Sequence, residues 1–405
     1  MQIENIKHKV NYYSLLLIAF MLPLKKELIA PLIILFIISS SYNFKQKLKS
    51  KKTLLLLGLF VLYAIGLLYS QNISEGLRDL ETKLSLALFP LVFFFSTIVY
   101  KDLLPKILKS FIEGCLASIA LGLTSSVIHY SFTNDISEFF YGSFSFFSHA
   151  SYFSMYLNFG IIVLYFFSFF PKKTTYIKPY VSLGLITVFS LSIFLLSSKT
   201  GISSIIVTHI IALAYWIIKH KKFIQGTISL FVIIAIFIIG YNKSDTINNR
   251  LHDVVSVFTF SENNVSSTST EYRIKAWGIA YSLIGNSPIY GFGTGTTRNL
   301  LTDEYKKNRY DYLAEKRLNC HNQFIETTLA IGVIGLLILI FVIYLPIIWS
   351  VKSNNYLLFF FIILITYNFL TESILETQSG VVFIAFFYTL LVQTLPTVKS
   401  TAIND

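Results

Sequence analysis

Long apolar runs recur along almost the whole chain and constrain its fold more than any other feature. Twelve such runs can be distinguished, at residues 11–24, 28–42, 53–70, 84–100, 111–130, 150–170, 180–197, 201–218, 223–241, 323–349, 356–370 and 380–396. A helix needs about 20 mostly apolar residues to cross a bilayer, because every backbone polar group must be bonded within the segment. The pattern predicts an all-α polytopic membrane protein with about twelve transmembrane helices.

The composition excludes most other classes of protein. Of the 405 residues, 54% are hydrophobic and only 13% are charged, whereas a soluble globular protein carries about 25% charged residues. The excess of 33 Lys and Arg over 21 Asp and Glu would suggest a nucleic-acid partner in a soluble chain. In a membrane protein, basic loops instead orient the spans by the positive-inside rule. We therefore expect the lipid bilayer as a partner and no nucleic acid.

Lysines are concentrated on alternate loops between the apolar runs. If the N-terminus is cytoplasmic, the lysine-rich loops at 43–52, 101–110, 171–179 and 219–222 all fall on the cytoplasmic side. This alternation predicts that both termini are cytoplasmic. It divides the chain into transmembrane helices 1–9 (residues 1–241), a large periplasmic loop (residues 242–322), and transmembrane helices 10–12 with a cytoplasmic tail (residues 323–405).

The large loop is expected to carry short helices of its own, since long structureless loops are uncommon in compact domains. Thr270 is a candidate N-cap for a mostly apolar helix over residues 271–284. The glycines of residues 291–295 predict a flexible turn, and residues 303–317 predict a second, polar helix.

Arg273 is the first candidate for a site residue. It falls in the first turn of its expected helix, near the positive end of the helix dipole, where an anion is favoured. A guanidinium beside free helix N–H groups suits a phosphate group. The alternative is an exposed arginine without a ligand.

A second group of polar residues opens the tenth expected span. His321 and Asn322 precede the span, and Glu326 follows about one helical turn deeper. A carboxylate inside a span is costly and by default functional. The alternative is that His321 and Asn322 cap the helix while Glu326 pairs with a neighbouring span.

Lys199 interrupts an apolar stretch that extends from residue 181 to residue 218. A lysine at mid-bilayer costs about 2.5–3.5 kcal/mol, so the stretch is expected to form two spans with Lys199 at the outer turn. The lysine then either extends to water, as long basic side chains do, or directs its charge into an outward cavity.

Further polar residues near the outer ends of spans are more typical of solvated or interfacial positions than of a site. They are Arg78, Lys83, His149, Tyr152, Glu372 and Glu376. The sequence has neither a His-Glu-x-x-His nor an Asp-x-Asp motif, and its seven histidines are scattered. We therefore expect neither a metal nor a cofactor, and any phosphate chemistry must use Arg and Lys.

Three stretches together resemble the O-antigen ligase and O-antigen polymerase superfamily of bacterial envelope glycosyltransferases. The first comprises residues 271–277 (EYRIKAW) and 286–295 (NSPIYGFGTG), which match an arginine–tryptophan helix and a Pro-x-x-Gly-x-Gly turn. The second comprises residues 320–326 (CHNQFIE) and 330–335 (AIGVIG), which match a His-Asn motif and a glycine-containing span. The third, residues 197–201 (SSKTG), has a lysine where the family usually has an arginine.

The resemblance implies a glycan transfer from undecaprenyl diphosphate to an acceptor hydroxyl at the periplasmic face of the bacterial inner membrane. Arg273 would hold the diphosphate, and His321 would act as general base or as a further diphosphate contact. Lys199 would bind phosphate without the bidentate geometry of arginine. Supporting candidates are Asn322, Glu326, Arg78, His149 and Glu372. We expect Lys199, Arg273 and His321 to line one pocket.

Three functions remain open at this stage. A ligase would transfer the glycan to lipid A–core, whereas a polymerase would transfer it to another lipid-linked glycan. Both enzymes use the same donor, and the single large loop favours the ligase. A polysaccharide flippase or other transporter would instead predict inverted repeats and broken helices at mid-membrane, while the polar residues here gather toward one face.

Overall fold

A computed structural model describes the chain as a helical protein. The expected all-α class is confirmed, since the described residues contain helices and one isolated antiparallel bridge between Tyr42 and Ser96. The chain divides into two compact units, Met1–Ser118 with Arg273–Asp405 and Ile119–Tyr272. The structure describes residues 2–42, 51–145, 147–169, 176–220 and 269–396.

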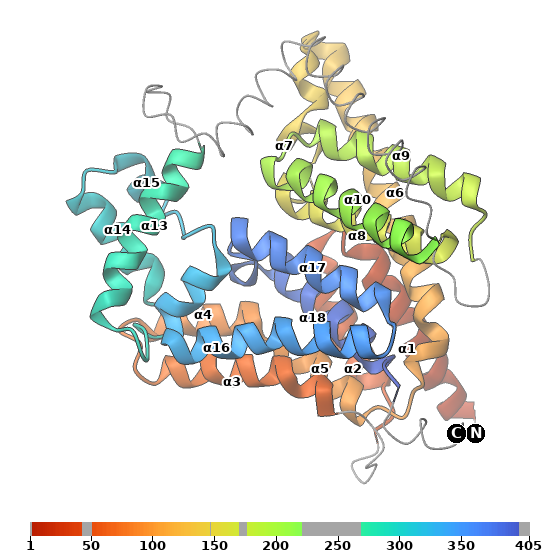
Figure 1. The fold of residues 1–405 in the computed structure, drawn as a ribbon, viewed down its shortest axis with the longest axis horizontal. Coiled ribbons are helices and arrows are strands. Elements are labelled where there is room, and N and C mark those ends of the chain that lie inside the picture. Colours follow the sequence, from red (N-terminus) through yellow and green to blue (C-terminus); the bar gives the residue numbers. More distant parts are fainter. Residues whose placement is uncertain (1, 43–50, 146, 170–175, 221–268, 397–405) are drawn as a thin grey trace. The chain divides into compact units, whose positions relative to one another are not determined.

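The first unit contains both ends of the described chain (Figure 1). Its helices are α1 (Gln2–Met21), α2 (Ile29–Ser39), α3 (Leu55–Leu67), α4 (Ile73–Lys83), α5 (Ser85–Phe95), the beginning of α6 (Tyr100–Thr133), nearly all of α13 (Ser269–Asn286), α14 (Thr297–Lys307), α15 (Asp311–Glu315), α16 (Gln323–Lys352), α17 (Tyr356–Thr371) and α18 (Gln378–Gln393). Short 3-10 turns are η1 (Lys26–Leu28), η2 (Lys51–Leu54) and η4 (Ile374–Glu376).

The second unit is smaller. It contains the remainder of α6, η3 (Ile136–Phe139), α7 (Tyr141–Phe144), α8 (Ala150–Ser168), α9 (Pro179–Leu195) and α10 (Lys199–His220). Helix α8 packs against both α9 and α10. The turn expected around Lys199 is present, because α9 ends at Leu195 and α10 begins at Lys199.

Within the described residues, four helices are long and apolar enough to cross a membrane, namely Tyr100–Thr133, Ala150–Ser168, Lys199–Ile218 and Gln323–Lys352. Shorter apolar helices include Pro179–Leu195, Tyr356–Thr371 and Gln378–Gln393. Each expected apolar run within the described residues contains a helix. The run at 223–241 lies outside the described residues. The count of twelve spans and the sides of the loops stay predictions.

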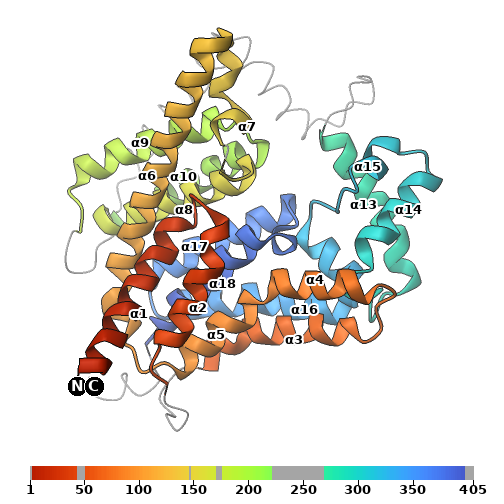
Figure 2. The same ribbon diagram turned by 180° about the vertical axis from the view of Figure 1, so that it is seen from behind.

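Helix α18 forms the centre of the first unit. Its side chains from Gly380 to Val392 are all buried, as expected of a helix that is apolar on every face. It packs against α5 and α17, as both views of the fold show (Figures 1 and 2). Three phenylalanines of α18, Phe383, Phe386 and Phe387, make ring contacts with phenylalanines of α5, α6 and α17, namely Phe89, Phe93, Phe111 and Phe361.

Helix α16 is broken near its beginning. Ile331 and Gly332 have non-helical backbone angles, with Gly332 at φ 68° and ψ −169°, a region that essentially only glycine occupies. The break separates a short initial helix from the long apolar remainder. Backbone groups freed by the break bond to the segment after α13. Val333 N donates to the Pro288 carbonyl at 2.9 Å, while the carbonyls of Leu329 and Ala330 accept from Phe292 N and Gly293 N.

The expectation that residues 291–295 form a flexible turn is wrong. Gly291, Gly293 and Gly295 all have positive φ, and a Cβ on any of them would meet backbone atoms closer than van der Waals contact. Thr294 N donates to the Gly66 carbonyl at 3.2 Å, and its hydroxyl donates to the Tyr63 carbonyl at 2.6 Å. The turn is therefore packed onto α3, and its glycines permit close backbone approach.

The expected helix over 271–284 is confirmed with wider bounds, because α13 begins at Ser269. Thr270 is thus inside the helix and does not cap it. The polar helix expected over 303–317 is two helices, α14 and α15, and α14 begins at Thr297. Arg309, between them, has φ 59°, which interrupts the helical path. Residues 242–268 of the expected loop lie outside the described residues.

We predict that Gly332→Ala destabilises the protein strongly. The new Cβ would overlap the Ile289 carbonyl oxygen, and an alanine at this backbone conformation costs about 1–3 kcal/mol before any clash. Thermal unfolding of the detergent-solubilised protein should therefore begin several degrees lower. The matched control is Gly58→Ala, because nothing lies within 4 Å of a Cβ there. Equal melting temperatures for the two variants would contradict the packed geometry of the break.

Candidate functional site

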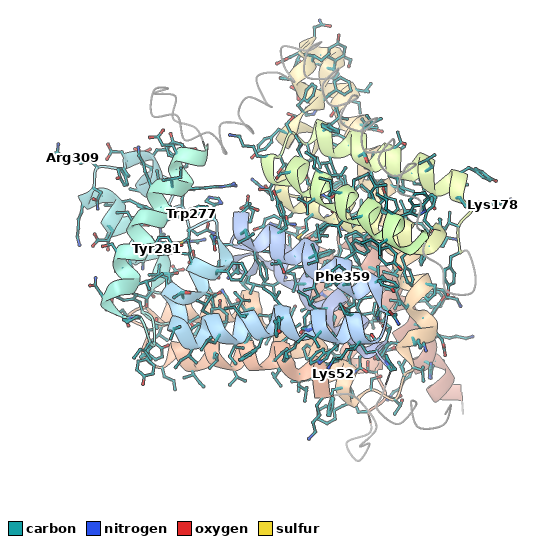
Figure 3. The ribbon with its side chains drawn as sticks, in the orientation of Figure 1. Lys52, Lys178, Trp277, Tyr281, Arg309 and Phe359 are labelled. Atoms are coloured by element: carbon teal, nitrogen blue, oxygen red, sulfur yellow. The ribbon has the colours of Figure 1, made fainter. Side chains whose placement is uncertain are left out.

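A chain of hydrogen bonds joins α13, the loop before α16, and α14. The indole Nε1 of Trp277 donates to the Cys320 carbonyl at 2.7 Å. Cys320 N donates to Glu326 Oε2, and the Thr297 hydroxyl donates to Glu326 Oε1, both at 3.0 Å. Figure 3 labels Trp277 and Arg309 in this region, which we call the α13 end of the first unit. The chain of bonds fixes the loop that carries His321.

Glu372 brings the two principal candidates of the sequence together. Its Oε1 accepts a hydrogen bond from Arg273 Nη2 at 2.9 Å, and its Oε2 lies 3.0 Å from His321 Nδ1. The side chains of Arg273, His321 and Glu372 are 22%, 29% and 11% exposed. They form a largely buried arginine–carboxylate–histidine cluster in which Arg273 and His321 keep some exposed surface.

The geometry assigns different tasks to the three groups. A carboxylate only accepts hydrogen bonds, so the Nδ1 of His321 carries the proton that points at Glu372. In the neutral imidazole, Nε2 is then the nitrogen that can accept a proton. Arg273 has five N–H donors, and the bond to Glu372 occupies Nη2. The cluster can therefore accept a proton at one end and donate hydrogen bonds to an anion at the other.

The side chain of Asn322, which precedes α16, bonds to backbone groups. Its side-chain oxygen caps α16 by accepting from Phe324 N and Ile325 N, and its Nδ2 donates to the Leu370 carbonyl at 3.1 Å. The neighbouring His321 has φ 47°, a conformation that is uncommon for residues other than glycine. The cap therefore holds a strained backbone position at the site.

Glu326 is buried, with 3% exposure, and bonds to Thr297 and to the loop backbone. This differs from the alternative considered for the sequence, a pair with a neighbouring span, because Thr297 and the Cys320 backbone both belong to the α13 end. Burial and Glu326 raise the pKa of the Cys320 thiol well above its usual value. Cys320 thus stays a thiol, and it is an unsuitable nucleophile.

Lys83 is the feature that sequence reasoning missed. It was expected to be solvated or interfacial, yet it is 1% exposed and its Nζ lies 2.8 Å from Glu376 Oε2. The ammonium also lies 4.8 Å from the centre of the Tyr63 ring. Burial alone would lower the pKa of Lys83, but Glu376, Asp79 and Tyr63 together raise it above its usual value. Lys83 is therefore charged.

Asp79 lies one helical turn before Lys83 on α4. Burial raises the pKa of Asp79 to about 6, although Lys83 opposes this shift. The sequence signal that could have indicated this region is weak. It consists of two charges four residues apart on an amphipathic segment that leads directly into an apolar run.

The other candidate residues are not shown to join the cluster of Arg273, His321 and Glu372. Arg78 is exposed on α4 and pairs with Glu75 at 3.5 Å. His149 is an exposed residue of the second unit that caps α8 by accepting from Ser151 N. Lys199 begins α10 in the second unit, so its place in a pocket shared with Arg273 and His321 stays a prediction.

Comparison with known proteins gives a family match over part of the chain. Residues 183–340 match the family model described as O-antigen ligase. This segment includes Lys199, Arg273 and His321, while Glu372 lies beyond it. A curated relative, an uncharacterized protein of Haemophilus influenzae, is 27% identical over 150 residues, which is 34% of this chain and 35% of the relative. The chain thus covers about a third of the length of that relative. Residues 183–340, which are less than half of the chain, are therefore similar to the O-antigen ligase family, and the apolar helices of the described residues are typical of a membrane protein.

Proposed function

We propose that the chain is a metal-independent ligase that transfers a glycan from undecaprenyl diphosphate to a hydroxyl of lipid A–core at the periplasmic face of the inner membrane. The observation that carries this proposal is the bridge formed by Glu372 between Arg273 and His321. It places a potential proton acceptor and an anion-binding cation on one carboxylate. The family description, O-antigen ligase, supports the same reaction.

The reaction needs one bond formed, one bond broken and one proton moved. The acceptor oxygen attacks the anomeric carbon of the donor sugar, and the bond from that carbon to the diphosphate oxygen breaks. Nε2 of His321 takes the hydroxyl proton, and the diphosphate leaves with the bonding electrons. Arg273 stabilises the developing negative charge, because preorganised donors are most effective in a site of low dielectric.

Glu372 has two functions in this proposal. It keeps the proton of His321 on Nδ1, so that Nε2 faces the acceptor, and it stabilises the imidazolium that forms during transfer. It also orients the guanidinium of Arg273 while leaving further N–H donors for phosphate oxygens. Lys199 remains a candidate diphosphate ligand on the basis of the sequence alone.

The reaction class can be tested in a strain that lacks this chain, by gel analysis of its lipopolysaccharide. We expect core without any attached O-polysaccharide, because a ligase performs the attachment itself. Core that carries a single repeat unit would instead indicate a polymerase. Normal lipopolysaccharide with altered export of the lipid-linked glycan would indicate a transporter.

We predict that Arg273→Ala lowers the transfer rate of the purified protein by roughly 10²-fold or more, since a single preorganised donor is worth that much in a polar transition state. The measurement is release of polyprenyl diphosphate from a synthetic lipid-linked oligosaccharide. The control is Arg309→Ala, which removes an exposed arginine between α14 and α15. Full activity of Arg273→Ala, with normal membrane insertion, would overturn the assignment.

Glu372→Gln should lower kcat by roughly 10²-fold, within the range that general acid–base catalysis contributes. The amide retains the shape of the side chain but removes the charge that stabilises a protonated His321. We expect a smaller change in KM for the donor, because Arg273 is still present. Glu81→Gln, an exposed carboxylate of α4, is the matched control. An unchanged kcat in Glu372→Gln would exclude the proposed role of the carboxylate.

Chelation should leave the transfer rate unchanged. The proposal assigns charge stabilisation to Arg273, so incubation of the purified protein with EDTA is expected to have no effect on initial rates. A loss of activity that Mg²⁺ restores would show that the metal-independent mechanism is wrong.

A further inference from the structure

The segment between α17 and α18 has a glutamate at each end, and each glutamate has its own cationic partner. Glu372 directly follows α17 as its C-cap and contacts Arg273 and His321. Glu376 ends η4, four residues later, and pairs with Lys83. The short 3-10 turn connects the two carboxylates, so a displacement of one glutamate is transmitted to the other through only a few residues.

The same segment is held from a second side by α16. The Gln323 side chain accepts from Leu375 N at 2.7 Å and donates to the Thr327 hydroxyl at 3.1 Å. Thr327 in turn lies 3.0 Å from the Tyr63 hydroxyl, and the Tyr63 ring lies against Lys83. Contacts from α4 and α16 therefore meet on the turn that separates Glu372 from Glu376, and Tyr63 of α3 links these two helices.

Stability alone is a weak explanation for the Lys83–Glu376 pair. Removing two charges from water is costly, and buried ion pairs can often be replaced by apolar residues without loss of stability. Removing one partner, by contrast, leaves an uncompensated charge. In this protein, removal of Lys83 would leave the charge of Glu376 uncompensated. Asp79, which lies on the same helix as Lys83, is also close.

We infer that Lys83 is a positioning residue for the transfer reaction. Acting through Glu376, it fixes the turn between α17 and α18 so that Glu372 meets both Arg273 and His321. This inference rests on the proposed function, and it assigns to α4 a role in catalysis without any contact between Lys83 and the substrate. Misplacement of a catalytic group by about 1 Å can cost roughly 10²-fold in rate.

The test uses the full-length protein in detergent or lipid nanodiscs. Lys83→Met should lower kcat by roughly 10- to 100-fold and change KM for the donor by less than about 3-fold, because Glu372 acts on the transition state while Arg273 still binds the diphosphate. Lys306→Met is the matched control, since Lys306 is exposed on α14 and pairs with Asp303 at the surface. It should retain the wild-type kcat.

A double variant separates positioning from stability. Lys83→Met combined with Glu376→Leu removes both charges and should restore the melting temperature toward that of the wild type. We expect its kcat to remain low, because an apolar pair does not fix the direction of the turn. Recovery of kcat together with the melting temperature would overturn the inference, because it would mean that Lys83 only neutralises the charge of Glu376.

The result can be distinguished from a failure of the proposed function. If Arg273→Ala and Glu372→Gln both retain full transfer activity, the proposed site itself is wrong. If these two variants are inactive while Lys83→Met has the wild-type kcat, the site is correct and the positioning role of Lys83 is excluded.

Discussion

The first unit depends on a helix break whose backbone groups are satisfied by a distant segment. A break in an apolar helix leaves carbonyl and N–H groups without partners, and these are costly in a membrane unless protein groups bond to them. Residues 288–293 supply those partners at the break in α16. The same bonds place the end of α13 against the beginning of α16, and therefore place Arg273 in reach of the loop that carries His321.

The pairing of opposite charges also determines which side chains lie together in this region. Glu372 shares its two oxygens between a guanidinium and an imidazole, and Glu376 neutralises a buried ammonium. The two carboxylates are close in sequence, yet they have separate partners on different helices. Under the proposed function, Glu372 takes part in the chemistry while Glu376 fixes the turn between α17 and α18.

Much of the fold followed from local patterns. Apolar runs predicted helices because a segment without polar side chains must satisfy its own backbone, and each run within the described residues contains one. The turn before Lys199 followed from the cost of a charge inside a span. The exact bounds of the helices were harder to predict from the sequence. Thr270 was expected as a cap and is inside α13, and the second polar helix divides at Arg309.

The sequence by itself determined the helical class and the resemblance to the O-antigen ligase superfamily, and it singled out Arg273 and His321 as candidates, since these depend on residue types and on short motifs. Only the tertiary structure decided that Glu372 joins Arg273 and His321, that Glu376 pairs with the buried Lys83, and that the glycines of residues 291–295 are packed. The physical reason is sequence separation. Arg273 and Glu372 lie 99 residues apart, and Lys83 and Glu376 lie 293 residues apart. No local pattern encodes which of two nearby glutamates a distant cation will meet, because that choice is made by the packing of helices around α18.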